Sequence, residues 1–137
     1  MKAKAYLQEI KRLDKKIENK QMEIASLYDL IQSVTSPVKE IIIQSNGEQD
    51  KLGSGVSKII DLQNEINVDI DRYIDRKLEA IRLINRLEND DYINILVRRY
   101  VNYEEWQTIA DNLHYTRQWI DKLHGRALLE FQKLIED

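Results

Sequence analysis

The sequence predicts an all-α protein in which a long antiparallel, coiled-coil-like helical hairpin precedes a C-terminal helix-turn-helix. Of its 137 residues, 33% are charged, and it contains only four Gly and one Pro, a composition that favours helices over sheets. Apolar residues recur every seven positions near the start of the chain, and at helical spacing in two later segments. These observations indicate one domain over residues 1–89 and a second over residues 90–137.

Residues 1–33 carry a seven-residue apolar repeat. Its members are Ile10, Ile17, Ile24 and Ile31, joined by Tyr6, Leu13 and Leu27 at the matching steps of three and four. Apolar residues every 3.5 positions stay on one seam only when helices wind around each other, so the repeat predicts a coiled-coil helix. Lys20 interrupts this seam. We expect its ammonium to reach past the seam to water, and the alternative is that Lys20 sets register or oligomeric state.

Residues 34–56 contain Pro37 and three of the four glycines, so we expect a flexible linker here. Asn46-Gly47 and Gly53-Ser54-Gly55 are typical turn formers, and residues 40–44 are expected to be a short extended or helical piece. A connection this long is unusual in a compact domain, which favours mobility.

A second helix is expected over residues 57–89 because a broad apolar stripe runs along it. The stripe comprises Ile59, Leu62, Ile66, Ile70, Tyr73, Ile74, Leu78, Ile81, Ile84 and Leu87. Two helices of matched length predict an antiparallel hairpin within the chain, and the competing arrangement is a homodimer paired through the first helices. Asp69, Asp71 and Asp75 alternate with basic residues and are expected on a solvated face.

The C-terminal domain is expected to contain three helices. Asp90 and Asp91 are candidate caps for a short helix over 92–100, and a helix over 103–113 has Glu104 and Glu105 in its first turn. A tight turn at 112–115 follows, and Thr116 caps a last helix that runs to about residue 136. The inward residues of these last two helices are expected to be Trp106, Ile109, Ala110, Leu113, Ile120, Leu123, Ala127, Phe131 and Leu134.

A helix of about ten residues, a tight turn and a capped second helix follow the order of a helix-turn-helix, which predicts binding to double-stranded DNA. Arg117 and Gln118 are expected to read guanine and adenine edges, and Lys122 and Arg126 to contact phosphates. Arg98 and Arg99 are candidates for further backbone contacts. Asp121 either accepts from cytosine or orients Arg117. Gly125 costs about 1 kcal/mol relative to Ala within a helix, so we expect a close approach there.

Composition excludes several classes of protein. The absence of Cys rules out a disulfide scaffold and a Cys-based zinc site, and it fits a reducing cytoplasm. His114 and His124 lack partners at metal-ligand spacing, and no catalytic constellation is visible, so we expect no metal, no cofactor and no enzymatic activity. No apolar run approaches the roughly 20 residues of a membrane span, which predicts a cytoplasmic protein without membrane contact. The net charge of −3 opposes a nucleic-acid partner, as do the six basic and eight acidic residues of segment 91–137.

The C-terminal domain resembles region 4 of bacterial sigma factors. The similarity lies in Arg99-Tyr100, Glu104-Glu105-Trp106, Ile109-Ala110, Leu113-His114-Tyr115-Thr116-Arg117, Ile120 and Leu123-His124-Gly125-Arg126-Ala127-Leu128. The chain as a whole resembles small phage proteins grouped with ArpU- and RinA-type late transcriptional regulators, many of which are known only as a domain of unknown function. Gly53-Ser54-Gly55 and Lys58-Ile59-Ile60-Asp61-Leu62 also match that group.

This resemblance implies a phage or prophage transcriptional regulator whose Arg117, Gln118 and Lys122 contact a promoter, with RNA polymerase as a further partner. Asp121 departs from the sigma pattern, in which a basic residue is common. Two other functions fit the same elements. One is a DNA-packaging component similar to a small terminase subunit, which would form a ring-sized oligomer, and the other is a protein-interaction module that does not touch DNA.

Overall fold

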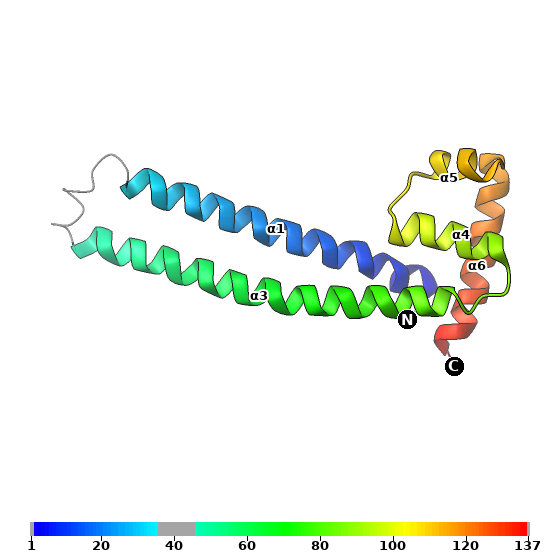
Figure 1. Ribbon diagram of the computed structural model, residues 1–137, viewed down its shortest axis with the longest axis horizontal. Helices are drawn as coiled ribbons and strands as arrows, with labels where there is room; N and C mark the ends of the chain where they lie inside the picture. Colours follow the sequence, from blue (N-terminus) through cyan, green and yellow to red (C-terminus); the bar gives the residue numbers. More distant parts are fainter. Residues whose placement is uncertain (1, 36–45, 137) are drawn as a thin grey trace. The chain divides into compact units, whose positions relative to one another are not determined.

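The computed structural model describes residues 2–35 and 46–136, and every regular element in these residues is helical (Figure 1). In chain order these elements are α1 (Ala3–Thr35), α3 (Asn46–Ile84), α4 (Asp90–Leu96), the π-helical turn η1 (Val97–Val101), α5 (Trp106–Leu113) and α6 (Arg117–Glu136). The prediction of an all-α protein is therefore confirmed. The helix expected over residues 1–33 is α1, whose bounds differ from that range by only two residues at each end.

The chain forms two compact units. Unit 1 comprises Met1–Asp14 and Arg72–Asp137, and unit 2 comprises Lys15–Asp71. These units differ from the two predicted domains, which meet between residues 89 and 90. The first turns of α1, which are far from the C-terminal helices in sequence, pack with these helices and with the last turns of α3.

The second long helix begins well before its expected start. Because α3 runs from Asn46 to Ile84, the prediction of a flexible linker is wrong for residues 46–56. The turns predicted at Asn46-Gly47 and at Gly53-Ser54-Gly55 are both helical. A Cβ on Gly55 would lie 3.1 Å from Cδ1 of Ile31, so this glycine allows α1 and α3 to approach closely. Packing against α1 offsets the low helix propensity of glycine here. Pro37 and residues 40–44 lie outside the described residues.

Unit 2 buries a charged pair on the apolar seam. Lys20 Nζ lies 2.6 Å from Asp69 Oδ2 and 3.5 Å from a Glu65 oxygen, and the side chains of Lys20 and Asp69 are only 19% and 6% exposed. The hydrogen bond to Asp69 raises the pKa of the Lys20 ammonium above its ordinary value. The expectations that Lys20 reaches past the seam to water and that Asp69 lies on a solvated face are therefore wrong.

The position of Asp69 in the helix explains its burial. It follows buried Ile66 by three residues and precedes half-buried Tyr73 by four, which places it on the inward stripe of α3. Asp71 and Asp75 are exposed, as expected. Two members of the predicted stripe, Ile74 and Leu78, are also exposed, so the buried stripe is narrower than the sequence suggests.

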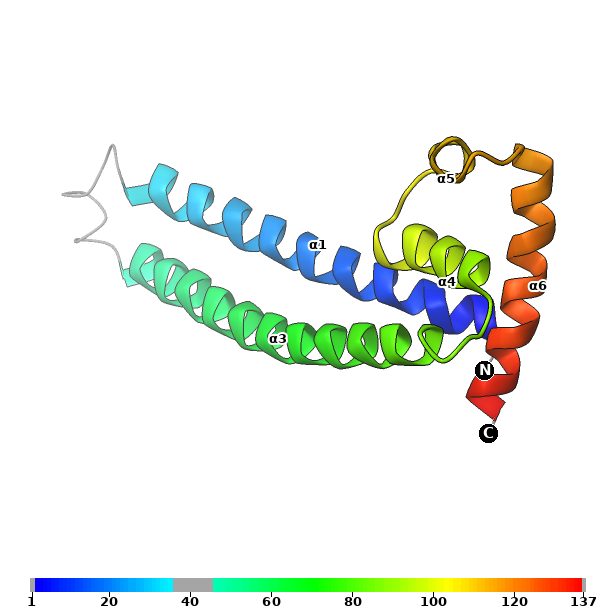
Figure 2. The same cartoon turned by 45° about the vertical axis from the view of Figure 1, so that its right-hand side comes forward.

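Unit 1 is organised around two apolar clusters that share α6. The first joins α1, α3, η1 and the second half of α6 through Tyr6, Leu7, Ile10, Ala80, Ile84, Tyr100, Ala127 and Phe131. The second joins α4, α5 and the first half of α6 through Ile95, Ile109, Ala110, Ile120 and Leu123. Figure 2 shows α5 near the start of α6 and the first turns of α1 beside its second half. One face of α6 is thus buried along most of its length.

Replacing Lys20 by Leu is expected to lower the thermal unfolding midpoint by several degrees, because the buried Asp69 carboxylate then loses its nearest cation. Replacing both Lys20 and Asp69 by Leu is expected to recover most of that loss, since an apolar pair fits the seam without a desolvation cost. Circular dichroism melts measure both effects, and Lys58→Leu on an exposed position of α3 is the matched control. Equal losses in the single and double variants would contradict the role given to the pair.

Candidate nucleic-acid interface

The turn between α5 and α6 is fixed by backbone hydrogen bonds. His114 follows α5 in the left-handed conformation (φ 60, ψ 38), and the Tyr115 N–H donates to the carbonyl of Ala110 at 3.0 Å. This pattern ends a helix abruptly by satisfying its last carbonyl groups. Residues 112 and 113, which were expected in the turn, belong to α5.

Thr116 begins α6 as predicted. Its Oγ1 accepts a hydrogen bond from the Trp119 N–H at 3.1 Å, which satisfies one of the unpaired donors of the first turn. The helix then runs without interruption from Arg117 to Glu136. The hydroxyl at this position therefore determines where the exposed face of α6 starts.

The ends of α4 and α5 differ from the predictions. The side chain of Asn89 caps α4 by accepting from the N–H groups of Asp91 (2.9 Å) and Tyr92 (3.2 Å), so Asp90 and Asp91 occupy the first turn instead of capping. The helix expected over 92–100 is α4 continued by η1. Because α5 starts only at Trp106, Glu104 and Glu105 precede it and are not in its first turn.

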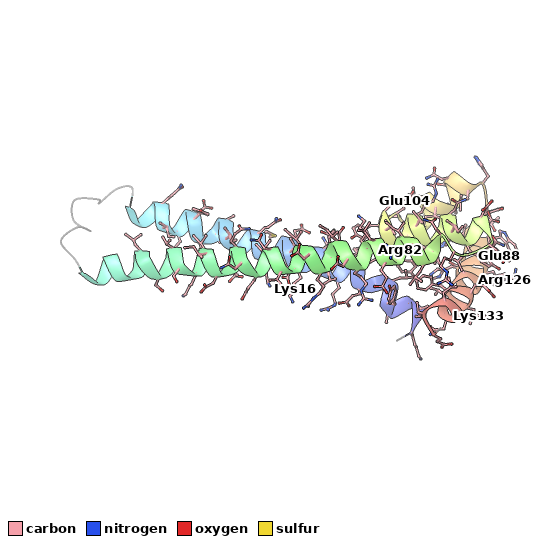
Figure 3. All side chains as sticks on the ribbon, turned by 60° about the horizontal axis from the view of Figure 1, so that its bottom comes forward. Lys16, Arg82, Glu88, Glu104, Arg126 and Lys133 are labelled. Carbon is pink, nitrogen blue, oxygen red and sulfur yellow. The ribbon has the colours of Figure 1, made fainter. Side chains whose placement is uncertain are left out.

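The face of α6 opposite the apolar clusters carries the side chains predicted to contact DNA. Ile120, Leu123, Ala127 and Phe131 are buried, as expected, and Leu134 is half-buried. The exposed residues of α6 include Arg117, Gln118, Asp121, Lys122, Gly125 and Arg126, and the others are Trp119, Leu129, Glu130, Lys133 and Glu136. Figure 3 draws the side chains of this part of the chain and labels Arg126. The structure therefore brings six residues of the predicted interface onto the accessible side of one helix.

Arg117 is held by two neighbours. Its Nε lies 3.3 Å from Oδ1 of Asp121, one helical turn further on, and its guanidinium carbon lies 5.4 Å from the centre of the Trp106 ring. The contact with Asp121 matches the expectation that this carboxylate orients Arg117. Arg126 lies 5.4 Å from the centre of the Trp119 ring, so each exposed arginine is placed beside an indole.

Arg98 and Arg99 make contacts within unit 1. Arg98 Nη1 lies 3.2 Å from a carboxylate oxygen of Glu104, and Arg99 Nη1 donates to the Glu104 carbonyl at 3.0 Å. The Arg99 guanidinium also stacks 4.6 Å from the centre of the Trp106 ring. Both arginines are half-buried and hold the segment that leads into α5. These bonds favour a structural role for them over the predicted backbone contacts.

His124 forms a cluster that the sequence analysis did not anticipate. Its Nε2 lies 2.7 Å from the Tyr100 hydroxyl, and its ring meets the Trp106 ring edge-on at 4.5 Å. Burial, reinforced by the positive charges of Lys4 and Arg99, lowers the pKa of His124 to about 4. Its position four residues after Ile120 and three before Ala127 is the signal that places it on the inward face.

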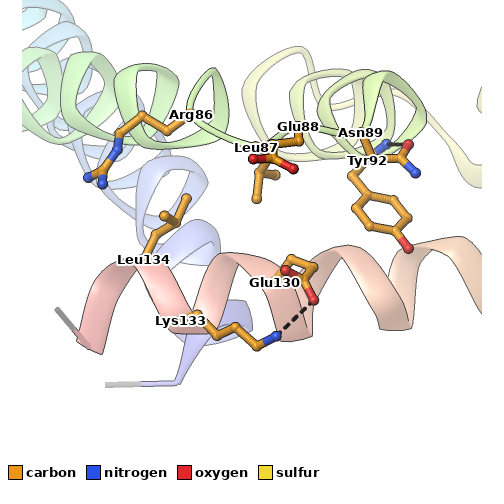
Figure 4. A pocket seen from close by; sticks show the side chains of 8 residues that line it. All are labelled: Arg86, Leu87, Glu88, Asn89, Tyr92, Glu130, Lys133 and Leu134. Carbon is orange, nitrogen blue, oxygen red and sulfur yellow. Dashed lines mark hydrogen bonds and ion pairs between the residues drawn. The ribbon is translucent and has the colours of Figure 1, made fainter.

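The described parts of the chain contain neither a group of side chains arranged for a metal ion nor a membrane-spanning helix. Among residues 2–35 and 46–136, no three His, Cys, Asp or Glu side chains are arranged to hold a metal ion. A cleft of about 440 Å³ lies where the segment between α3 and α4, together with the first turn of α4, faces α6 (Figure 4). Two of its charged residues, Glu130 and Lys133, pair with each other at 3.0 Å. Within the same described ranges, no helix combines the length and apolarity of a membrane span.

Comparison with known families identifies a shared region. Residues 33–132 match the family described as a protein of unknown function, DUF1492. The chain belongs to this family. The match includes α3, α4, η1, α5 and most of α6, so the exposed face of α6 lies within the part that defines DUF1492. No curated protein and no solved structure matches the chain.

The half-buried His124 predicts a specific dependence of stability on pH. Its pKa is about 4 in the folded protein against an ordinary value of 6.5, so between these values the unfolded chain binds a proton that the folded chain does not. Stability should therefore fall as pH decreases from about 6.5 to about 4. His124→Gln removes the contribution of this imidazole to the pH dependence of stability. The difference in melting temperature between the wild type and the variant should therefore shrink on acidification. His114→Asn, which tolerates the left-handed conformation, is the control that should keep the wild-type dependence. If the difference in melting temperature between the wild type and His124→Gln did not change with pH, the folded protein would not hold His124 in its neutral form.

Gly125→Ala is expected to raise the free energy of unfolding by about 0.5–1 kcal/mol, because Ala is the better helix former. The added Cβ meets nothing within 4 Å, so no close approach within the described part of the chain opposes it. Gly55→Ala is the matched comparison, since its Cβ would crowd Ile31 and should reduce or reverse the gain. Urea unfolding measures both variants, and destabilisation by Gly125→Ala would be inconsistent with the open position seen here.

Proposed function

We propose that this protein is a transcriptional regulator of phage or prophage origin that binds duplex DNA through a helix-turn-helix made of α5 and α6. The observation that carries this proposal is the exposed face of α6. It begins at the Thr116 cap and presents Arg117, Gln118 and Lys122, while the opposite face is buried. A helix fixed in this way can enter a major groove without losing its own packing.

The chemistry of the exposed side chains suits distinct parts of a duplex. The planar fork of an arginine fits the N7 and O6 acceptors of guanine, and a glutamine amide fits the N6 and N7 groups of adenine. Arg117 and Gln118, in the first turn of α6, are the proposed base readers. Lys122 and Arg126 lie one and two turns further along the helix, where phosphate contacts would set its register.

Resemblance supplies the biological context of this proposal. The similarity of residues 99–128 to region 4 of sigma factors favours promoter DNA as the target and RNA polymerase as a further partner. The similarity to ArpU- and RinA-type regulators favours a phage or prophage role. Pairing of two chains through their N-terminal helices remains part of the proposal, because a dimer would present two α6 helices to two half-sites.

A second candidate function rests on the environment of Arg117. Its bond to Asp121 and the excess of acidic residues in segment 91–137 favour a protein-interaction module over a DNA reader. Binding to guanine would require Arg117 to keep Asp121 as an orienting partner or to exchange it for the base. Titration with duplex DNA separates the two candidates, since an interaction module would show no salt-dependent affinity for a duplex.

Arg117→Ala is expected to weaken binding to the preferred sequence by about 1–3 kcal/mol and to reduce discrimination between sequences. Lys122→Ala is expected instead to weaken binding to all duplexes alike. It should also lower the slope of log K against log salt by the contribution of one phosphate contact. Fluorescence anisotropy against phage promoter fragments measures both, with Lys58→Ala in unit 2 as a control of equal charge change. Unchanged discrimination in Arg117→Ala would remove this side chain from base recognition.

A further inference from the structure

The first residues of the chain add positive charge to the unit that contains α6. Residues 1–14 pack in unit 1, and their charged side chains are Lys2, Lys4, Lys11 and Arg12 against Glu9 and Asp14. Counting charges over residues 91–137 alone therefore leaves out cations that the fold places in the same unit. Lys2 and Lys4 are both exposed.

Lys2 and Lys4 line a cleft shared with α6. The cleft has a volume of about 410 Å³, and its other lining residues include Gly125, Leu129 and Gln132 of α6. The Ala3 N–H donates to Oε1 of Gln132 at 2.5 Å, which fixes the first turn of α1 against this helix. Lys4 is also close enough to His124 for its charge to lower the pKa of that imidazole. The two lysines are thus tied to the helix that carries the proposed base readers.

We propose that Lys2 and Lys4 extend the α6 interface by contacting the sugar-phosphate backbone of the bound duplex at the edge of the major groove. This inference rests on the proposed function and adds a second element, the first turn of α1, to the DNA-binding surface.

The dimensions of a helix and of B-DNA agree with this arrangement. Gly125 follows Arg117 by eight residues, or about 12 Å along the helix axis, and the major groove is about 12 Å wide. If Arg117 contacts base edges near one wall of the groove, Gly125 lies about one groove width away along the helix. At that position the phosphate backbone of the opposite wall would run. A glycine with open space at its Cβ position leaves room there for a phosphate strand.

The charges in the cleft favour a polyanion over a small ligand. Of the described residues that line it, Glu136 is the one carboxylate, and its Oε1 accepts a hydrogen bond from Gln132 Nε2 at 2.9 Å. Exposed, flexible ammonium groups suit a continuous phosphate backbone, because each acts as a point charge without demanding fixed geometry. Leu129, which is 67% exposed, offers an apolar surface for a deoxyribose.

The test compares the salt dependence of duplex binding in matched variants of the untagged 137-residue chain. The probe is a fluorescently labelled duplex of mixed sequence longer than one helical turn, titrated at several salt concentrations. In Lys2→Gln/Lys4→Gln, the slope of log K against log salt should decrease by about 1.8, and affinity should fall roughly ten-fold or more at physiological salt. Lys15→Gln/Lys58→Gln removes two exposed lysines of unit 2 and should leave the slope unchanged. Lys2→Arg/Lys4→Arg should retain the wild-type slope.

The outcomes distinguish failure of this inference from failure of the proposed function. A wild-type slope in Lys2→Gln/Lys4→Gln, together with a reduced slope in Lys122→Gln, would overturn the role of the N-terminal lysines and leave DNA binding by α6 intact. Equal slope losses in the unit 1 and unit 2 double variants would show a non-specific charge effect and would also overturn it. Absence of duplex binding by the wild-type chain at low salt would overturn both proposals.

Discussion

The burial of one face of α6 is the constraint on which the arrangement of unit 1 depends. Ile120 and Leu123 pack with α4 and α5, whereas Ala127 and Phe131 pack with α1 and α3. Each fully buried Leu, Ile or Phe side chain contributes about 1.5–3 kcal/mol, so four consecutive turns of the helix are held in one rotational setting. Because that face is committed to the core, the residues on the other face are necessarily presented to solvent. The same packing that stabilises the unit therefore selects which side chains a partner can meet.

Local signals in the sequence were sufficient for some elements and insufficient for others. The heptads of α1, the Thr116 cap and the inward stripe of α6 depend on residues a few positions apart, and the sequence predicts them well. The sequence does not predict the start of α3, because the close approach of Gly55 to Ile31 joins residues 24 positions apart. The pairing of Lys20 with Asp69 likewise joins residues 49 positions apart, which no local pattern reveals. For His124, the helical spacing did contain the signal, but the polarity of the side chain hid it.

Charge counting along the chain gave a misleading picture of the surface. The acidic excess of residues 91–137 includes Glu104, whose carboxylate pairs with Arg98, and Asp91, which accepts from the Tyr115 hydroxyl at 3.0 Å. Both carboxylates therefore make contacts within unit 1. Glu104 lies in the segment before α5, and Asp91 lies in the first turn of α4. In the first half of α6, Asp121 is the one exposed carboxylate beside Arg117, Lys122 and Arg126, whereas the second half adds the exposed Glu130, Lys133 and Glu136. The sign of the charge that a partner meets thus depends on the helix face and not on the segment total.

The packing of the first residues of α1 against the last helix also explains why the C-terminal segment is not self-contained. Ala127 and Phe131 are completely buried, and the ring of Phe131 lies 5.6 Å from that of Tyr6, with Leu7 and Ile10 in the same cluster. Without residues 1–14, half of the inward face of α6 would be open to water and would lose most of its stabilisation. The exposed face depends on that burial for its rigidity, because most of the stability of a helix in a protein comes from tertiary packing of its apolar face. A fixed exposed face on α6 therefore requires the packing of the N-terminal helix against its opposite face.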